Sequence, residues 1–213
     1  MKSDRTPKAQ PYDLVKRIVD VVVSLLGLVV TFPLQACIAV LVARKLRRPI
    51  LFRQQRPGRG GTPFELFKFR TMVELDAARG LLTDEQRLTD FGSKLRRTSM
   101  DELPTLWNVL RGDMSLVGPR PLMMQYLDRY SPEQRRRHEV RPGITGLAQI
   151  EGRNMLSWED KFRADISYVD RRGPLLDVKI LLRTVLLVLR REGITADGAA
   201  TMPEFFGPGH CDC

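Results

Sequence analysis

The stretch KRIVDVVVSLLGLVVTFPLQACIAVLVARKLRR, residues 16–48, decides how this chain is organised. Its apolar part runs from Ile18 to Ala43, carries one charge at Asp20, and exceeds the roughly 20 apolar residues that cross a bilayer. The stretch is too long for a cleavable signal peptide, and no small-residue cleavage site follows it. A buried helix of a soluble protein is the weaker alternative, because so apolar a run would need a large surrounding core.

The flanks of this stretch favour a helix that enters the membrane and returns on the same side. Basic residues stand at both ends: Lys16, Arg17, Arg44, Lys45, Arg47 and Arg48. Lys and Arg stay on the cytoplasmic side of a membrane, so both ends carry the cytoplasmic mark. Pro33 lies near the middle, where it removes a backbone donor and kinks a helix. We therefore expect an N-terminal re-entrant helix, with a kinked ordinary span as the alternative.

The whole chain is basic, with a formal net charge of +10 over 213 residues. This charge favours polyanionic partners, namely nucleic acid, anionic lipid or nucleotide phosphates. Aromatic residues make up only 7% of the chain and do not alternate with basic residues as on a single-strand stacking surface. The three cysteines, Cys37, Cys211 and Cys213, form no disulfide framework, which fits a reducing compartment. His138 and His210 lack partners at the spacing of a zinc site.

The pattern after the apolar stretch predicts a β-hairpin. A run at 50–55 leads into the turn-rich segment 56–61, and an alternating run follows at 64–70. A period of two places Lys68 and Arg70 on one face of the second strand. These two cations could meet a phosphate group or could form a solvated edge. Residues 73–98 are predicted to form a polar insert of helix or loop.

Asp101 and Glu102 form an acidic pair at the expected start of the next helix. We predict that Asp101 is the N-cap and that Pro104 lies in the first turn, where proline is tolerated. Helix N-terminal amides stabilise negative charge, so they would lower the pKa of Asp101 and keep it ionised as a nucleophile. Such a pair is often only a cap, and the functional interpretation rests on its position. The helix should carry an apolar stripe at Leu103, Leu106, Trp107 and Leu110.

Three turns that carry an arginine follow the acidic pair. Arg120 lies between two prolines, Arg141 opens the turn 141–146, and Arg153 lies within 152–154. Restricted backbones would hold these guanidinium groups ready for bidentate phosphate binding. Each turn alone could be structural, but the three together favour an anion site. A last helix, from about Leu175 to Arg191, has an apolar and a basic face, and could lie on a membrane or cover the core.

Eight short motifs occur in order along the chain: KRIVD (16–20), FRQQRPG (52–58), FKFRTM (67–72), DELP (101–104), GDMS (112–115), GPRP (118–121), RPGITG (141–146) and LDVK (176–179). Together they resemble the bacterial sugar transferases, the monotopic polyprenyl-phosphate phosphoglycosyl transferases. The resemblance covers roughly residues 14–195 and is to the small members, which consist of the catalytic unit alone. In that family the re-entrant helix breaks at Ser-Pro. Phe32 replaces the serine here, and Thr31 is a candidate substitute.

The resemblance implies an enzyme that moves a sugar-1-phosphate from a UDP-sugar to polyprenyl (undecaprenyl) phosphate and releases UMP. This would be the first membrane step of surface glycan or glycoprotein assembly. Asp101 would be the nucleophile that forms a covalent phosphosugar intermediate, and Glu102 the second carboxylate, in metal binding or acid–base work. Lys68, Arg120 and Arg153 match positions near the bound phosphates or nucleotide. Mg²⁺, held by Asp101 and Glu102, would offset the pyrophosphate charge.

These observations give one expected organisation. Residues 1–48 would form the re-entrant membrane helix, 49–195 a cytosolic catalytic domain and 196–213 a C-terminal tail. The expected fold class is α+β: a mainly helical monotopic membrane protein with an N-terminal re-entrant helix, a β-hairpin and amphipathic interfacial helices. The expected substrate-binding residues are Lys68, Arg70, Arg120, Arg141 and Arg153.

The expected location is the cytoplasmic face of a bacterial inner membrane. Expected partners are a UDP-sugar, polyprenyl phosphate and membrane lipid, with no nucleic acid, and a homodimer is left open. The alternative is a membrane-anchored basic scaffold or a nucleic-acid-binding protein, which would leave the acidic pair and the arginine turns without a purpose.

Overall fold

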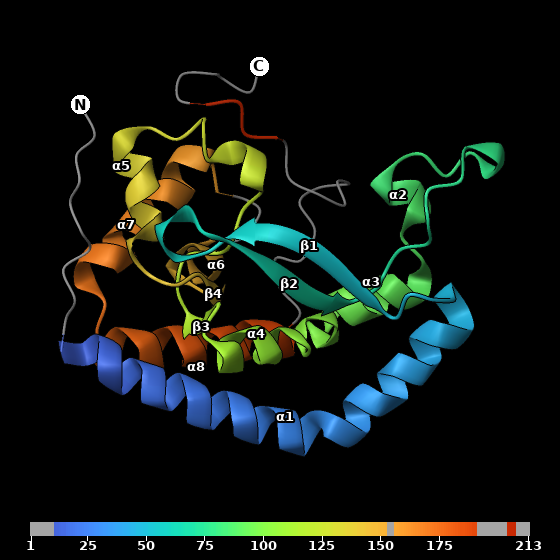
Figure 1. Cartoon of the computed structure of the whole chain (residues 1–213), viewed down its shortest axis with the longest axis horizontal. Helices are drawn as coiled ribbons and strands as arrows, with labels where there is room; N and C mark the ends of the chain where they lie inside the picture. The colour runs from blue at the N-terminus through green and yellow to red at the C-terminus, as the bar shows by residue number, and fades with distance from the viewer. Residues whose placement is uncertain (1–10, 153–155, 191–203, 208–213) are drawn as a thin grey trace.

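The computed structural model describes residues 11–152, 156–190 and 204–207 and has a mainly helical α+β fold (Figure 1). One long helix, α1 (Pro11–Leu46), forms the base of the view, and a hairpin of β1 (Leu51–Pro57) and β2 (Pro63–Phe69) lies above it. The other elements are η1 (Arg59–Gly61), η2 (Ala77–Arg79), α2 (Asp84–Arg87), α3 (Asp90–Arg97), η3 (Met100–Glu102), α4 (Thr105–Arg111), β3 (Ser115–Val117), η4 (Met124–Tyr126), α5 (Pro132–Arg135), η5 (Arg136–Glu139), β4 (Gly143–Thr145), α6 (Leu147–Glu151), α7 (Trp158–Arg171) and α8 (Pro174–Arg190).

Helix α1 is continuous over 36 residues and bends partway along its length (Figure 1). Pro33 lies inside it and cannot donate a backbone hydrogen bond to the preceding turn. Thr31 donates through Oγ1 to the carbonyl of Gly27 at 2.6 Å and accepts from the side-chain Nε2 of Gln35 at 2.9 Å. Hydroxyl groups that bond back in this way bend helices. Thr31 therefore supplies the hydroxyl that Phe32 lacks, as predicted.

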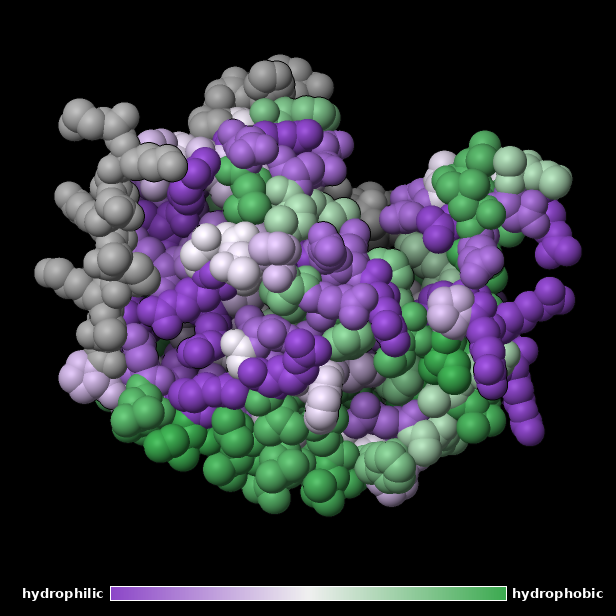
Figure 2. Space-filling model, viewed as in Figure 1, coloured by the Kyte–Doolittle hydropathy of each residue, from purple (hydrophilic) through white to green (hydrophobic). Residues whose placement is uncertain are grey.

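The apolar side chains of α1 mostly face away from the protein. Leu14 and Val30, for example, are 70% and 75% exposed, and Figure 2 shows a hydrophobic band along the edge that α1 occupies. Helix α8 also turns apolar side chains outward, at Leu175, Val178, Leu182, Val185, Leu186 and Leu189. Helix α1 is long and apolar enough to cross a membrane. These exposed faces indicate membrane association. Helix α8 also covers the core, because Ile180 is buried in the main cluster with Leu176 and Leu181 packed against it, so the core-covering alternative is confirmed.

Polar side chains attach the first half of α1 to the rest of the protein. The Asp20 carboxylate is buried and accepts a hydrogen bond from the Leu116 amide at 3.1 Å. Lys16 forms an ion pair with Asp177 at 2.5 Å. Arg17 donates to the carbonyls of Val109 and Leu110 at the end of α4. Lys16, Arg17 and Asp20 thus face the protein, where each has a partner.

The second half of α1 is attached by apolar packing instead. Ile38, Val42 and Leu46 are buried in one cluster with Phe69 of β2 and Leu95 of α3. Burying apolar area of this kind is the main favourable contribution to folding. Both halves of the bent helix are therefore held by the same body of the protein.

The predicted hairpin is confirmed, with β1 and β2 antiparallel from the pair Leu51–Phe69 to the pair Pro57–Pro63. A second, parallel pair joins β3 to β4 in the middle of the core. A Cβ on Gly143 would lie 2.1 Å from the backbone nitrogen of Gly118, so only glycine allows these segments to approach so closely. The insert 73–98 is confirmed as short helices and loops, and α2 projects from the body (Figure 1).

The face that α4 buries differs from the predicted apolar stripe. Thr105, Asn108 and Val109 are the buried residues of α4, whereas Trp107 is half exposed. Leu106 packs against α1, where a Cβ on Gly27 would lie 3.1 Å from its side chain. Leu106 of the predicted stripe therefore faces α1, and α4 binds β2 through the polar side chains of Thr105 and Asn108.

Candidate functional site

The acidic pair lies in the 3₁₀ turn η3 and does not cap a helix. Asp101 and Glu102 stand inside the turn, which Ser99 precedes in the left-handed conformation (φ 54°). Helix α4 begins only at Thr105, and Pro104 precedes it. The prediction that Asp101 is an N-cap was therefore wrong, because the chain makes a separate turn before the proline. Asp101 is 8% exposed in this turn.

Glu102 joins two cations that come from distant parts of the chain. Its Oε1 lies 2.5 Å from Nζ of Lys68 on β2 and 3.1 Å from Nη2 of Arg120 in the loop after β3. The side chains of Lys68 and Glu102 are about four-fifths buried, whereas that of Arg120 is half exposed. The structure therefore brings together four of the predicted site residues: Asp101, Glu102, Lys68 and Arg120.

Hydrogen bonds between α4 and β2 fix Lys68 beside the acidic turn. Thr105 donates through Oγ1 to the Phe67 carbonyl at 2.9 Å. Asn108, which is fully buried, accepts from the Phe67 amide at 3.1 Å and donates to the Glu65 carbonyl at 2.7 Å. These bonds satisfy the free edge of β2 around residue 67. Lys68 is thus positioned by backbone pairing on a rigid strand.

A buried ion pair positions Arg120 from the other side. Arg137 donates to the carbonyl of Arg120 at 2.7 Å and also to the Asp165 carboxylate at 2.7 Å. Both Arg137 and Asp165 are buried. Breaking such a pair leaves a buried charge without compensation, so this contact is costly to lose. The Pro-Arg-Pro loop is therefore held through its backbone, which leaves the Arg120 guanidinium free to face Glu102.

The pKa values of the neighbouring carboxyl groups of Asp101 and Glu102 differ widely. Burial, together with the charge of Glu102, raises the pKa of Asp101 to about 6, although Lys68, Arg96 and Arg120 act in the opposite direction. Burial alone would also raise the pKa of Glu102, but Lys68 and Arg120 outweigh it and hold that pKa at about 2. The prediction that helix amides lower the pKa of Asp101 was therefore wrong. Glu102 is the permanently ionised member of the pair, and Asp101 takes up a proton in mild acid.

A pocket beside this pair has an excess of positive charge. Its lining includes Lys68, Glu102, Arg120 and a further cation, Arg56 of β1. Burial, together with the nearby charge of Arg120, lowers the pKa of Arg56 to about 10. Within the described part of the chain, the buried Nε of Arg56 has no hydrogen-bond partner. Three cations against one lining carboxylate suit a ligand with two phosphate groups.

Sequence reasoning did not identify Arg56 or Arg96 as site residues. Arg56 begins the turn-rich segment 56–61, which was assigned to the hairpin loop. Its position in a basic turn was the one feature of the sequence that could have marked it as a site residue. Arg96 lies near enough to lower the pKa of Asp101, and it donates to Thr71 at 3.1 Å. It lies in the last turn of α3, where a basic residue is ordinary and gives no signal of function.

Three predicted substrate-binding residues are not part of this cluster. Arg70 donates to the carbonyls of Leu46 and Arg48, because the chain leaves the strand after Phe69 and the alternation of side chains ends there. Arg141 donates to the Gly112 carbonyl at 2.9 Å and lines a different pocket. Arg153 lies outside the described residues. Substrate binding by these three residues stays a prediction.

The site fits Mg²⁺ only in company with substrate phosphates. The described residues contain no group of three or more His, Cys, Asp or Glu side chains that could hold a metal ion. Asp101 and Glu102 offer two carboxylates, and Glu102 already has two cationic partners. Mg²⁺ is commonly bound through one or two carboxylates together with substrate phosphates. The donor set is therefore adequate for a metal that arrives with a diphosphate.

Comparison with known proteins gives consistent matches. Residues 11–191 match the profile of the family described as bacterial sugar transferase. The chain is 50% identical over 197 residues to the uncharacterized sugar transferase EpsL of Bacillus subtilis, covering 92% of this chain and 98% of that protein.

Two relatives have names that state an activity. Identity is 43% over 185 residues to the UDP-glucose:undecaprenyl-phosphate glucose-1-phosphate transferase of Caulobacter vibrioides, covering 81% of this chain and 69% of that protein. Identity is 37% over 191 residues to the Escherichia coli protein of the same name, covering 84% of this chain and 41% of that longer protein.

Proposed function

Because this chain belongs to the bacterial sugar transferase family, we propose that it transfers a sugar-1-phosphate from a UDP-sugar to undecaprenyl phosphate and releases UMP. The observation that carries the proposal is the pairing of Glu102 with both Lys68 and Arg120 beside the buried Asp101. It supplies a candidate nucleophile and cations for a diphosphate in one place. The exposed apolar faces of α1 and α8 support a lipid acceptor.

The reaction proceeds in two displacements. The Asp101 carboxylate attacks the phosphorus that bears the sugar, the bond from this phosphorus to the bridging oxygen breaks, and UMP leaves with that oxygen. A phosphate oxygen of undecaprenyl phosphate then attacks the aspartyl phosphosugar, which releases the Asp101 carboxylate and forms the sugar diphospholipid. Water must stay out between these steps, and the burial of Asp101 favours this.

The surrounding cations bind the diphosphate and stabilise charge on the transferring group. Lys68 and Arg120 lie at Glu102, and Arg56 lines the same pocket. A guanidinium can donate two parallel hydrogen bonds to phosphate, which gives orientation as well as charge. Asp101 and Glu102 would hold Mg²⁺ together with the substrate diphosphate. When bound, the metal would neutralise charge on that diphosphate.

The bent α1 supports a re-entrant arrangement on the cytoplasmic face of the inner membrane. Basic residues flank both ends of the apolar stretch, and both halves of the helix are attached to the same body. This arrangement would let one site reach a nucleotide in water and a phosphate at the lipid surface. A homodimer stays a prediction.

The activity is tested directly by UMP release. Purified protein with undecaprenyl phosphate should release UMP from one or a few members of a UDP-sugar panel, and should release far less when the lipid is omitted. Release of a different mononucleotide from another donor class would indicate a different transferase. If the protein released no mononucleotide from the UDP-sugars or from the other class of donors, the proposal would be contradicted.

The rate should depend on pH through Asp101. Because its pKa is about 6 and the nucleophile must be ionised, kcat/KM should fall about tenfold per pH unit below pH 6. Glu102, with a pKa of about 2, stays ionised throughout this range. Initial rates between pH 5 and 8 measure the profile, and thermal midpoints at each pH separate it from unfolding. A rate that stays level down to pH 5 would exclude Asp101 as the titrating nucleophile.

Replacing Pro33 should change the topology of α1. Pro33→Ala restores a backbone donor and favours a straight helix long enough to span, so some molecules should carry the N-terminus across the membrane. A cysteine at Ser3, with native cysteines removed, reports this by labelling with an impermeant thiol reagent in whole cells. Labelling of that cysteine when Pro33 is intact would establish a full span and overturn re-entrance.

A further inference from the structure

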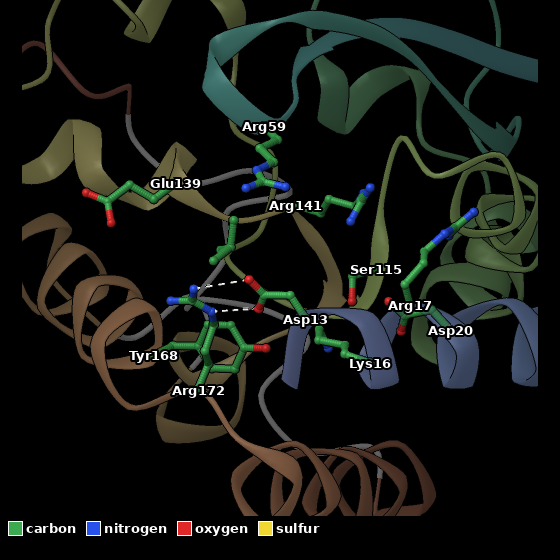
Figure 3. Close-up of a pocket in the computed structure, with 11 residues that line it drawn as sticks. Asp13, Lys16, Arg17, Asp20, Arg59, Ser115, Glu139, Arg141, Tyr168 and Arg172 are labelled. Carbon is green, nitrogen blue, oxygen red and sulfur yellow. Dashed lines mark hydrogen bonds and ion pairs between the residues drawn. The ribbon is translucent and has the colours of Figure 1, made fainter. Parts of the chain in front are cut away.

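A second pocket lies between the first half of α1 and the β3–β4 pair (Figure 3). It shares no lining residue with the pocket beside Glu102. Its basic lining residues come from separate segments of the chain: Lys16, Arg17, Arg59, Arg141 and Arg172. The proposed transfer reaction assigns no role to this pocket.

Several of these charges already have partners within the fold. Lys16 pairs with Asp177, and Arg172 pairs with Asp13 at 3.0 Å. Arg17 donates to the last carbonyls of α4, where a cation also interacts favourably with the helix dipole. These three cations hold the N-terminal part of α1 in place.

Arg59 and Arg141 keep unused donors. Within the described segments, the Arg59 side chain has no hydrogen bond or ion pair, and the Arg141 side chain uses only its Nε, which donates to the Gly112 carbonyl. Burial, together with the positive charges of Arg17 and Arg59, lowers the pKa of Arg141. The two guanidinium groups therefore lie close to other positive charges, which Asp13 and Asp20 offset only in part. Figure 3 shows the two guanidinium groups on the side of the pocket formed by η1 and the segment before β4.

Ser115 supplies an independent sign of a ligand. Its side chain is 1% exposed and lines the pocket, yet its Oγ has no hydrogen-bond partner among the described residues. Its backbone amide is satisfied by the Pro142 carbonyl at 2.8 Å. Buried hydroxyl groups are nearly always hydrogen-bonded, because leaving one unpaired is unfavourable. A ligand oxygen in the pocket would satisfy this hydroxyl.

Each acidic lining residue has a hydrogen-bond or ion-pair partner other than Arg59 and Arg141. Asp13 is held by Arg172, Asp20 by the Leu116 amide, and Glu139 by Arg136 at 3.2 Å. The remaining groups are two guanidinium groups and one hydroxyl, which is the donor set that a tetrahedral oxyanion accepts from.

We propose that Arg59, Arg141 and Ser115 bind a phosphate group at a second site, separate from the site of the transfer reaction. The phosphate could belong to an anionic phospholipid headgroup or to a soluble ion. The lipid source is within reach because α1, which lines the pocket through Asp13 to Asp20, also presents exposed apolar residues along the same turns, including Leu14 and Ile18.

The test has two arms on the purified full-length protein. In a phosphate-free detergent buffer, calorimetric titration measures the affinity for inorganic phosphate. In nanodiscs, native mass spectrometry counts retained phosphatidylglycerol, with phosphatidylcholine nanodiscs as the comparison. The variants are Arg59→Gln and Ser115→Ala. Arg53→Gln, a nearby exposed arginine, is the control for the loss of one positive charge.

Each variant should weaken phosphate binding about tenfold or more, or should abolish the retention of phosphatidylglycerol, while Arg53→Gln changes neither. Loss in the first arm identifies a soluble phosphate, and loss in the second identifies a lipid headgroup. Ser115→Ala breaks no recorded hydrogen bond, and Arg59 is exposed, so both variants should fold.

Equal binding by the wild type and both variants in both arms would overturn the proposal, as would a wild type that binds neither probe. Phosphate binding that Lys68→Met abolishes and Arg59→Gln leaves intact would assign the ion to the pocket beside Glu102 and would equally overturn it. Because the test measures binding without turnover, its outcome does not depend on the proposed transfer activity.

Discussion

Replacing Asp101 with asparagine is expected to abolish UMP release, by at least about 10³-fold, while the protein becomes more stable. The amide cannot form the bond to phosphorus that the carboxylate forms. The stability effect follows from the pKa of about 6, which lies above the ordinary value of 3.8. A carboxyl whose folded pKa is raised loses stability as the pH rises from its unfolded pKa to its folded pKa, so ionised Asp101 destabilises the folded protein at neutral pH. Asparagine removes this destabilisation.

The two effects are measured separately. UMP release gives the rate, and the thermal midpoint at pH 7.5 should rise by a few degrees. Intact-protein mass spectrometry of the wild type with UDP-sugar and no lipid should give an adduct of the mass of a sugar phosphate, which the variant lacks. Asp84→Asn on the projecting α2 is the matched control and should leave rate and adduct unchanged. Turnover by Asp101→Asn near the wild-type rate would refute the assignment of the nucleophile.

Replacing Arg120 with alanine is expected to lower kcat/KM by about 10²–10³-fold. The change removes one of the two cations at Glu102 and one phosphate-binding guanidinium. Arg120→Lys should restore little, because an ammonium group cannot donate the two parallel hydrogen bonds of a guanidinium. The pKa of Glu102 should move upward from about 2, since Lys68 alone would remain to hold it down.

Stability should change little in Arg120→Ala, because the arginine side chain is half exposed and Lys68 still pairs with Glu102. Arg163→Ala, an exposed arginine on α7 that pairs with Asp160, is the control for the loss of charge. Wild-type activity in Arg120→Ala would mean that the Pro-Arg-Pro loop serves only the fold.

Short-range sequence patterns correctly predicted the individual helices and strands whose formation depends mainly on neighbouring residues. Alternation at 64–70 predicted β2, and the apolar stretch with Pro33 predicted a long helix with a bend. The same alternation was extended one residue too far at Arg70, where the end of the strand redirects the side chain to the end of α1. The residue at which a strand ends depends on its pairing with other segments, and the two-residue alternation in the sequence does not show where this pairing stops.

The candidate site was predictable in its residues more than in its electrostatics. The acidic pair, Lys68 and Arg120 were all identified, but the sign of the Asp101 pKa shift was not. The helix-cap argument considered only local amides, whereas burial and the neighbouring Glu102 dominate in the folded chain. The backbones of the turns that carry Arg120 and Arg141 meet, since the Gly143 amide donates to the Pro119 carbonyl at 3.0 Å, yet the two arginine side chains line different pockets. The direction in which each side chain points, which no motif records, therefore separates two arginines that looked alike in sequence.

The attachment of both halves of α1 to one body has a consequence for the bilayer. Lys16 and Asp20 hold the first half, and Ile38 and Val42 hold the second. In the re-entrant arrangement, the fold then sets the distance of Asp101 from the lipid surface. The depth and tilt of a spanning helix would not affect this distance. Hydrophobic mismatch, which tilts spanning helices as bilayer thickness changes, would act on one leaflet only. Catalysis by this chain should accordingly tolerate membranes of different acyl-chain length.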